Sequence, residues 1–157
     1  LIDIYPDLIK ILLIITLLIC SALISGSEVA FFSLSKTDLK KISSSNAKNL
    51  KLISFLRSDP RRLLATLLVS NNFINISIVL LLASFGQLFD VIFFPNWLNF
   101  VLEVGFITAL ILLFGEILPK VYANRKPISF SKKMAFPVRF IDKYLFFFLT
   151  IPMSRMT

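Results

Sequence analysis

The sequence predicts an all-α integral membrane protein with three transmembrane helices, juxtamembrane helices and a C-terminal interfacial amphipathic helix. Two observations support this prediction. Hydrophobic residues make up 57% of the 157 residues, against roughly 45–50% in an average soluble domain, and a globule of this size cannot bury so many of them. In addition, three apolar stretches each reach the roughly 20 residues that a helix needs to cross a bilayer.

The three predicted spans cover residues 8–34, 63–89 and 98–123, and they differ in polar content. The first span is charged only at Lys10 and Glu28. It is too long for a signal peptide, and the basic segment that opens a signal peptide is missing before it. The second span contains no charged residue, and the third contains three. Three helices that cross the bilayer are therefore expected.

The distribution of Lys and Arg predicts how the spans are oriented. Of the 17 basic residues, one is Lys10, eight lie in residues 35–62, none lies in residues 90–97 and eight lie from Lys120 onward. Cytoplasmic loops carry an excess of Lys and Arg. We therefore expect the N-terminus outside and the C-terminus in the cytoplasm, in a bacterial inner membrane. Because the basic residues flank apolar stretches, no nucleic-acid partner is expected despite the excess of 17 basic over 9 acidic residues.

The segments beside the spans predict helices at the membrane surface. Ser35, followed three residues later by Asp38, is typical of a helix N-cap. Apolar residues then alternate with Lys and Ser through residues 39–55, as in short surface helices. Residues 128–157 predict an interfacial amphipathic helix. A fourth span from Met134 to Met153 is the disfavoured alternative, because it would place a proline and three charged residues, Asp142 among them, in the hydrocarbon.

The residue types that are missing exclude several classes of enzyme. The chain has no His and a single Cys, Cys20. A Ser-His-Asp triad is therefore impossible within it, and zinc sites built from thiolates and imidazoles need more ligands than it offers. We expect no enzyme activity. The chain begins without Met and stops without an evident ending, so we also expect residues 1–157 to be one transmembrane domain of a longer protein.

Each predicted span contains one polar patch, at residues 25–28, 71–75 and 115–120. With a rise of 1.5 Å per residue, Ser25 lies about 14 Å above the cytoplasmic end of its span. Asn71 lies about 12 Å above the end of the second span, and Glu116 about 10 Å above the end of the third. The three patches can therefore meet at one level, in the cytoplasmic half of the bilayer.

The side chains in these patches offer hard oxygen ligands. Asn71 and Asn75 are four residues apart and share a helix face. Their carbonyl oxygens, the Ser25 hydroxyl and the Glu116 carboxylate suit Mg²⁺, Ca²⁺ or Na⁺ better than soft transition metals. Pro119 adds a backbone feature, because it lacks an N–H and frees carbonyls in the preceding turn. Together these residues predict a cation site.

Simpler interpretations stay open for single residues. Asn side chains in spanning helices often only join helices by hydrogen bonds. Glu116 can pair with Lys120 one turn later, which does not exclude ion binding. Glu28 lines an entrance or pairs with a basic residue, and it is a possible secondary ligand. The small residues Ser21, Ala22, Ser25 and Gly26 form a stripe that allows close helix approach.

Three strings in these patches resemble the transmembrane domain of the CorC/CNNM (cyclin M) family. They are Ser25-Gly26-Ser27-Glu28-Val29-Ala30-Phe31-Phe32-Ser33, Leu68-Val69-Ser70-Asn71-Asn72-Phe73-Ile74-Asn75-Ile76 and Phe114-Gly115-Glu116-Ile117-Leu118-Pro119-Lys120. Their order, their spacing and the layout of three spans also match, so the similarity covers nearly the whole chain. Each string is short, but the three together are specific.

The resemblance implies a homodimeric Mg²⁺ transporter in the lipid bilayer, an exporter, with coupling to Na⁺ influx proposed for some members. It further implies juxtamembrane helices and a cytosolic pair of CBS modules that bind ATP, which are absent from residues 1–157. Carried over by motif, the metal ligands would be Ser25, Asn71, Asn75, Glu116 and a backbone carbonyl, at Gly115 or just past Pro119. Asn72 matches the motif and is a possible secondary ligand or faces a helix interface.

The sequence thus predicts a secondary transporter in which a largely dehydrated Mg²⁺ sits between the spans. Rocking of the helices around Gly26 and the Pro119-Lys120 segment would open the site. The alternative is a non-transporting membrane anchor that dimerises a cytosolic regulatory module or a motility or secretion assembly.

Overall fold

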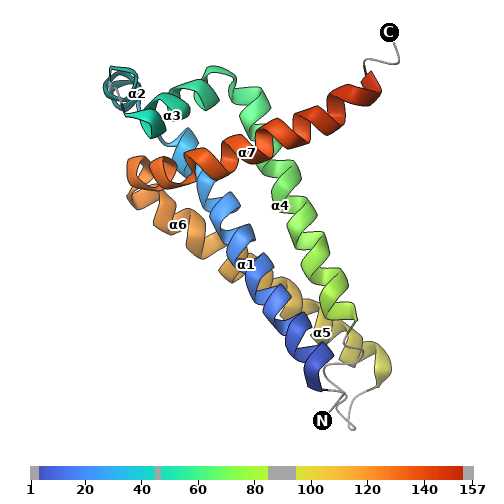
Figure 1. The fold of residues 1–157 in the computed structure, drawn as a ribbon. Coiled ribbons are helices and arrows are strands. Elements are labelled where there is room, and N and C mark those ends of the chain that lie inside the picture. Colours follow the sequence, from blue (N-terminus) through green and yellow to red (C-terminus); the bar gives the residue numbers. More distant parts are fainter. Residues whose placement is uncertain (1–3, 45–46, 85–94, 154–157) are drawn as a thin grey trace.

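The computed structural model describes residues 4–44, 47–84 and 95–153 of the chain (Figure 1). These residues form helices without strands, as an all-α fold requires. In chain order the helices are α1 (Ile4–Phe32), α2 (Lys36–Ser43), α3 (Lys48–Ser58), α4 (Pro60–Ala83), α5 (Asn96–Leu110), the π-helix η1 (Ile111–Ile117), α6 (Leu118–Arg125) and α7 (Pro127–Met153).

Three stretches of helix within the described residues are long and apolar enough to cross a membrane. They are Leu8–Phe32, Pro60–Ala83 and Asn96–Arg125, and the third combines α5, η1 and α6. Three helical stretches of spanning length therefore coincide with the three predicted spans, with small shifts at their ends. The second begins at Pro60 because the Asp59 side chain caps it, accepting a hydrogen bond from the Arg62 N–H at 3.1 Å. Its predicted end at residue 89 lies outside the described residues.

Helix α1 is the centre of the fold. It contacts α4 on one side and η1 and α6 on another, and α7 packs against it as well (Figure 1). Two hydrophobic clusters hold these contacts. One joins Ile14 of α1 to Ile78 of α4 and Ile111 of η1. The other joins Phe31 of α1 to buried residues of α3, α4 and α7. The second and third transmembrane stretches are therefore both packed against α1, which forms the first.

Helix α7 runs across α1 and α4 instead of alongside them (Figure 1). It buries Met134, Ala135 and Val138 in the larger cluster, while Phe136 and Phe140 on its other side are exposed. This course across the other helices differs from that of a fourth span, and the interfacial position of residues 128–157 stays a prediction. Residues 154–157 of the predicted helix lie outside the described residues.

The short helices α2 and α3 continue the larger hydrophobic cluster beyond the end of α1. The predicted N-cap at Ser35 is confirmed, since the Ser35 Oγ accepts a hydrogen bond from the Asp38 N–H at 3.1 Å and Asp38 Oδ2 accepts one from the Ser35 N–H at 3.1 Å. The Ser35 hydroxyl also donates to Asp38 Oδ2 at 2.6 Å, and this bond, together with that from the Ser35 N–H, lowers the pKa of the Asp38 carboxyl. Ile42 and Ile53 bury the apolar faces of the two helices.

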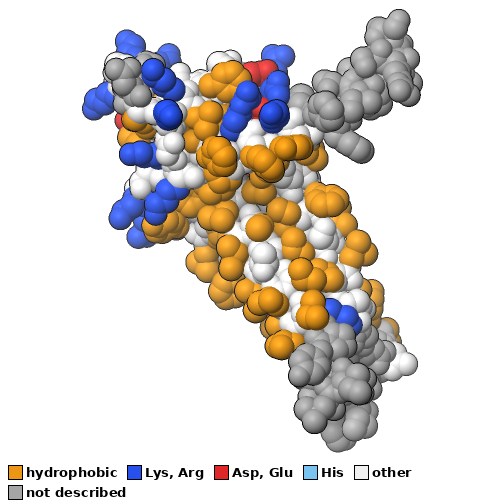
Figure 2. All heavy atoms as spheres, viewed as in Figure 1, with side chains coloured by type: hydrophobic (Ala, Val, Ile, Leu, Met, Phe, Trp, Pro, Cys, Tyr) orange, Lys and Arg blue, Asp and Glu red, His pale blue; other side chains and the backbone are white. Residues whose placement is uncertain are grey.

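The surface separates into a basic end and an apolar body (Figure 2). Lys and Arg side chains gather at the end formed by α2, α3 and α7, whereas hydrophobic side chains cover the long body. Exposed residues of that body include Phe73 and Leu80 on α4 and Phe100 and Phe106 on α5. Apolar side chains that face outward over the length of three helices are what a lipid environment requires.

Candidate cation site between the transmembrane helices

The polar contact at the centre of the bundle joins α1 to α4. Ser21 Oγ on α1 lies 3.1 Å from Asn71 Oδ1 and 2.7 Å from Asn75 Oδ1, and it donates to both. Asn71 is buried, and Asn75, one turn further along α4, is half-buried. A hydroxyl has a single hydrogen to donate, so two amide oxygens share one donor. The result is three oxygen atoms gathered at one point between two helices.

The third transmembrane stretch reaches the same point through Gly115. A Cβ atom at Gly115 would lie 3.0 Å from Ser21 Oγ, which is closer than almost any side chain packs. Glycine therefore allows η1 to approach α1 at the level where Ser21 contacts the two asparagines. Asn71, Asn75 and Gly115, which belong to different polar patches of the sequence, therefore meet at the Ser21 hydroxyl.

The backbone around Gly115 is a π-helix over Ile111–Ile117. Its last turn is widened, since the Leu118 N–H bonds to the Leu113 carbonyl five residues back. Pro119 follows directly and has no N–H, so the Gly115 carbonyl does not receive the bond that residue 119 donates in an α-helix. The expected release of carbonyls before Pro119 coincides with this π-helix, and such π-turns occur frequently at functional sites.

Ser25 lies one turn beyond Ser21 on α1 and is 1% exposed. Its Oγ makes no hydrogen bond to any residue that the structure describes. Gly26, beside it, is covered by Phe130 of α7, whose ring atom Cζ lies 2.7 Å from where a Cβ would be. Gly26 thus permits the close approach of α7 to α1. A buried hydroxyl without a partner is costly unless a ligand or water satisfies it.

Glu116 forms a charged trio with Lys120 and Glu28. Lys120 Nζ lies 2.8 Å from Glu116 Oε1 and 3.2 Å from Glu28 Oε2. The predicted pairing of Glu116 with Lys120 is therefore confirmed, and Glu28 pairs with the same ammonium. The side chains of the trio are 26–31% exposed.

We call Ser21, Ser25, Asn71, Asn75 and Gly115 the polar seam. Four of these residues were predicted as candidate ligands, and Ser21 was assigned only to close helix packing. The signal that identifies Ser21 is its position one turn before Ser25, on the same face of α1. Asn72, the possible secondary ligand, is exposed and lies outside the seam. Within the described residues no group of three or more His, Cys, Asp or Glu could hold a metal. The oxygens that the seam itself offers are neutral.

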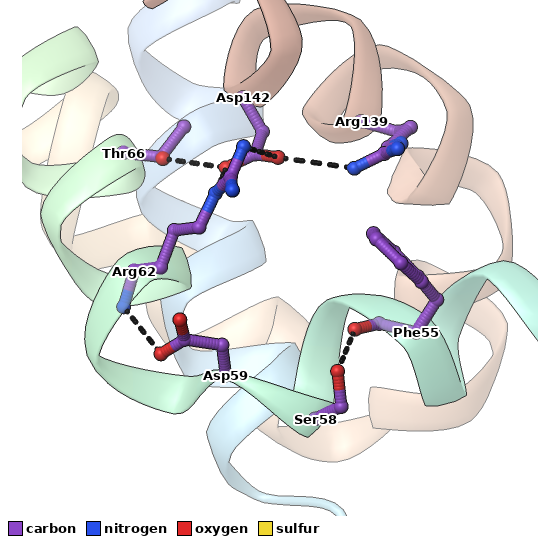
Figure 3. A network of polar contacts seen from close by, with 7 residues as sticks. All are labelled: Phe55, Ser58, Asp59, Arg62, Thr66, Arg139 and Asp142. Atoms are coloured by element: carbon purple, nitrogen blue, oxygen red, sulfur yellow. Dashed lines mark hydrogen bonds and ion pairs between the residues drawn. The ribbon is translucent and has the colours of Figure 1, made fainter. Parts of the chain in front are cut away.

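A second buried polar cluster lies where α7 crosses α4, and we call it the ionic clamp (Figure 3). Asp142 is 3% exposed and accepts two hydrogen bonds from Arg62. Nε donates to Oδ1 at 2.8 Å and Nη2 donates to Oδ2 at 3.0 Å. Thr66 Oγ1 donates to Oδ1 at 3.2 Å, and Arg139 Nη1 to Oδ2 at 3.3 Å. The Arg139 guanidinium also lies 4.1 Å from the centre of the Phe55 ring. No part of this cluster was predicted.

The chain is similar to a family of membrane domains and to several of its members. Residues 12–157 match the model of the "Cyclin M transmembrane N-terminal domain". The "UPF0053 protein sll1254" of Synechocystis is 31% identical over 130 residues, which cover 82% of this chain and 36% of that protein. The "Metal transporter cnnm-4" of Caenorhabditis elegans is 31% identical over 125 residues, covering 76% and 26%. The "UPF0053 inner membrane protein YfjD" of Escherichia coli is 28% identical, covering 77% and 26%.

This chain therefore spans between 26% and 36% of the length of these relatives. The match over residues 12–157 covers the first transmembrane stretch from residue 12 onward, and it covers the other two stretches and α7 in full. The chain is an integral membrane protein and belongs to the cyclin M (CNNM) transmembrane-domain family.

Proposed function

We propose that this chain is the transport domain of a Mg²⁺ transporter and that the polar seam holds the ion during transport. The single observation that carries the proposal is the convergence of Ser21, Asn71 and Asn75 against Gly115, at the junction of all three transmembrane stretches. A relative from Caenorhabditis elegans is named a metal transporter, which is consistent with this assignment.

The chemistry of the seam suits a hard divalent cation. Amide and hydroxyl oxygens are ligands for Mg²⁺, which prefers six oxygens at about 2.0–2.1 Å and gives up its water reluctantly. The Asn71 and Asn75 oxygens share one donor, the Ser21 hydroxyl, and the Ser25 hydroxyl has no partner among the described residues. A cation would satisfy all three oxygens, together with the Gly115 carbonyl.

The sparse charge at the seam favours release as well as binding. Glu116 is the single carboxylate in the proposed ligand set, and the other ligands are neutral. Carboxylate-rich sites bind divalent cations tightly, whereas a site with one carboxylate and several neutral oxygens holds the ion less firmly. Transport requires such an exchangeable site, and Gly26 and the Pro119-Lys120 segment are the places where we expect helices to shift.

The wider setting of the function is also part of the proposal. The basic end formed by α2, α3 and α7 would face the cytoplasm of a bacterial inner membrane, with the N-terminus outside (Figure 2). The domain would act as a homodimer that exports Mg²⁺, with Na⁺ as the coupling ion. Cytosolic CBS modules that bind ATP would follow it in the whole protein.

Mg²⁺ binding to the purified chain in detergent tests the proposal. Titration calorimetry should detect one Mg²⁺ site per chain, and thermal unfolding should shift upward as RT ln(1 + [Mg²⁺]/Kd) predicts. Asn75→Leu should remove both effects, and Asn72→Leu, at an exposed neighbour, should leave them unchanged. A non-transporting anchor predicts no Mg²⁺ effect on the unsubstituted chain, and that result would refute the assignment.

A further inference from the structure

The charged trio beside the seam holds one cation between two anions. Lys120 Nζ contacts Glu116 Oε1 at 2.8 Å and Glu28 Oε2 at 3.2 Å. The three residues come from α6, η1 and α1, so the ammonium joins the third transmembrane stretch to the first. One positive charge lies within ion-pair distance of two carboxylates, and the trio has a net charge of −1.

Glu116 needs a counter-charge whenever the seam is empty. It lies within the third transmembrane stretch, about 14 Å by helical rise from the end at Arg125, where an unpaired carboxylate is costly. Its side chain is 31% exposed in the folded chain. Lys120 supplies the missing charge at a distance typical of a direct ion pair.

A divalent cation that binds Glu116 would repel this ammonium. Lys120 already has its second carboxylate, Glu28, within 3.2 Å. The ammonium can therefore give up Glu116 without becoming an unpaired charge at this depth. Glu28 lies on α1, one turn after Ser25. It therefore stays beside Lys120 while Glu116 on η1 exchanges the ammonium for the metal ion.

We propose that Lys120 is a built-in counter-cation of the metal site, which neutralises Glu116 in the empty state and transfers to Glu28 when a divalent cation binds. This inference rests on the proposed function and extends it, because it assigns a tethered competitor for the metal. Lys120 then weakens metal binding, which favours release, and Glu28 strengthens metal binding without being a ligand.

Mg²⁺ titrations of four forms of the chain in detergent test this role: unsubstituted, Lys120→Met, Glu28→Gln and the double variant. Lys120→Met should tighten Mg²⁺ binding about two- to fivefold, the range that a partly exposed ion pair is worth. Glu28→Gln should weaken binding by a similar factor, because the ammonium then stays on Glu116. In the double variant the effect of Glu28→Gln should vanish. Lys120→Gln serves as a second uncharged variant, and Lys126→Met, at an exposed position, as the charge control.

The outcomes separate this inference from the proposed function. Weaker Mg²⁺ binding in both Lys120 variants would show a structural role and overturn the inference while leaving the Mg²⁺ site intact. If Glu28→Gln weakened binding equally with and without Lys120, Glu28 would be a direct ligand, and the transfer would be refuted. No Mg²⁺ binding in any of the four forms would refute the proposed function and this inference together.

Discussion

The polar seam and the ionic clamp are both buried polar clusters, but their bonding differs. In the ionic clamp each oxygen of Asp142 accepts two hydrogen bonds, and two guanidinium groups more than offset its charge. In the polar seam two amide oxygens share the Ser21 hydroxyl, and the Ser25 hydroxyl has no partner among the described residues. A saturated cluster has no ligand positions left, whereas an unsaturated one does. We conclude that the clamp fixes α7 on α4 and that the seam is suited to a ligand.

The largest expected effect comes from breaking the ionic clamp. Arg62→Met removes the two-fold contact with Asp142 and leaves a buried carboxylate with one partly exposed arginine. Breaking a buried ion pair from one side costs about 3–5 kcal/mol. We expect a loss near the lower end of that range in chemical unfolding in detergent, because Arg62 is 38% exposed.

The matched control for this change is Arg61→Met, since Arg61 is the exposed neighbour of Arg62. It should change the free energy of unfolding little. Under conditions where Arg62→Met remains folded, its Mg²⁺ affinity should equal that of the unsubstituted chain. A loss of Mg²⁺ affinity without a loss of stability would reverse the roles that we assign to clamp and seam.

Substitution in the seam should produce the opposite pattern. Asn71→Leu removes one proposed ligand, and we expect Mg²⁺ affinity to fall more than about tenfold, which corresponds to about 1.4 kcal/mol of binding free energy. Unfolding without Mg²⁺ should change by only about 0.6 kcal/mol, the average for a hydrogen bond between membrane helices. Calorimetry and unfolding on the same samples would measure both quantities. A large loss of stability with unchanged affinity would show that Asn71 only joins helices.

Two glycines of the third transmembrane stretch allow a matched comparison of a crowded and an open position. A Cβ at Gly115 would lie 3.0 Å from Ser21 Oγ, whereas at Gly105 it would meet nothing within 4 Å. Gly115→Ala should push η1 away from α1, with a cost of about 1 kcal/mol in stability and a several-fold loss of Mg²⁺ affinity. Gly105→Ala should leave affinity unchanged and stabilise the helix slightly. Equal effects at both positions would show that the close approach at Gly115 has no special role.

The smallest effect is expected at the surface cap of α2, where polar bonding has no link to the seam. Hydrogen bonds from Ser35 lower the pKa of Asp38 in the folded chain. A lowered folded pKa gives a stabilisation that is present above the unfolded value, about 3.9, and that is lost as pH falls through the folded value. Ser35→Ala removes the hydroxyl bond, which is the larger cause, but keeps the Ser35 N–H bond, so it should reduce this dependence on pH below about 4 in thermal unfolding. A dependence that is unchanged in Ser35→Ala would assign it to other carboxylates.

The sequence predicts the elements of this fold better than it predicts the contacts between them. The three spans follow from apolar length and sparse charge, and the Ser35 cap follows from local spacing. The Glu116–Lys120 pair follows from helical periodicity. All of these depend on residues that are close in the chain, so the sequence carries a direct signal for them.

Contacts between distant residues have no such signal. Asp142 was treated as a charge that a membrane helix would exclude, yet it is buried because Arg62, 80 positions away, reaches it. Ser21 was assigned to helix packing because its contact with Asn71 and Asn75 depends on how α1 and α4 face each other. Counting residues along the helices places the polar patches at one depth. Which side chains meet there depends on how the helices are rotated against each other, and only the structure gives that.

Mn²⁺ is the most direct probe of the central claim, because it is a hard cation with oxygen preferences like those of Mg²⁺ and scatters anomalously. Crystals of this protein grown with Mn²⁺ should show an anomalous peak between α1, α4 and η1, within about 2.2 Å of the Asn71 and Asn75 side-chain oxygens. That peak should disappear in Asn75→Leu crystals. A seam without anomalous density at saturating Mn²⁺, or a peak confined to the basic end of the molecule, would contradict the account.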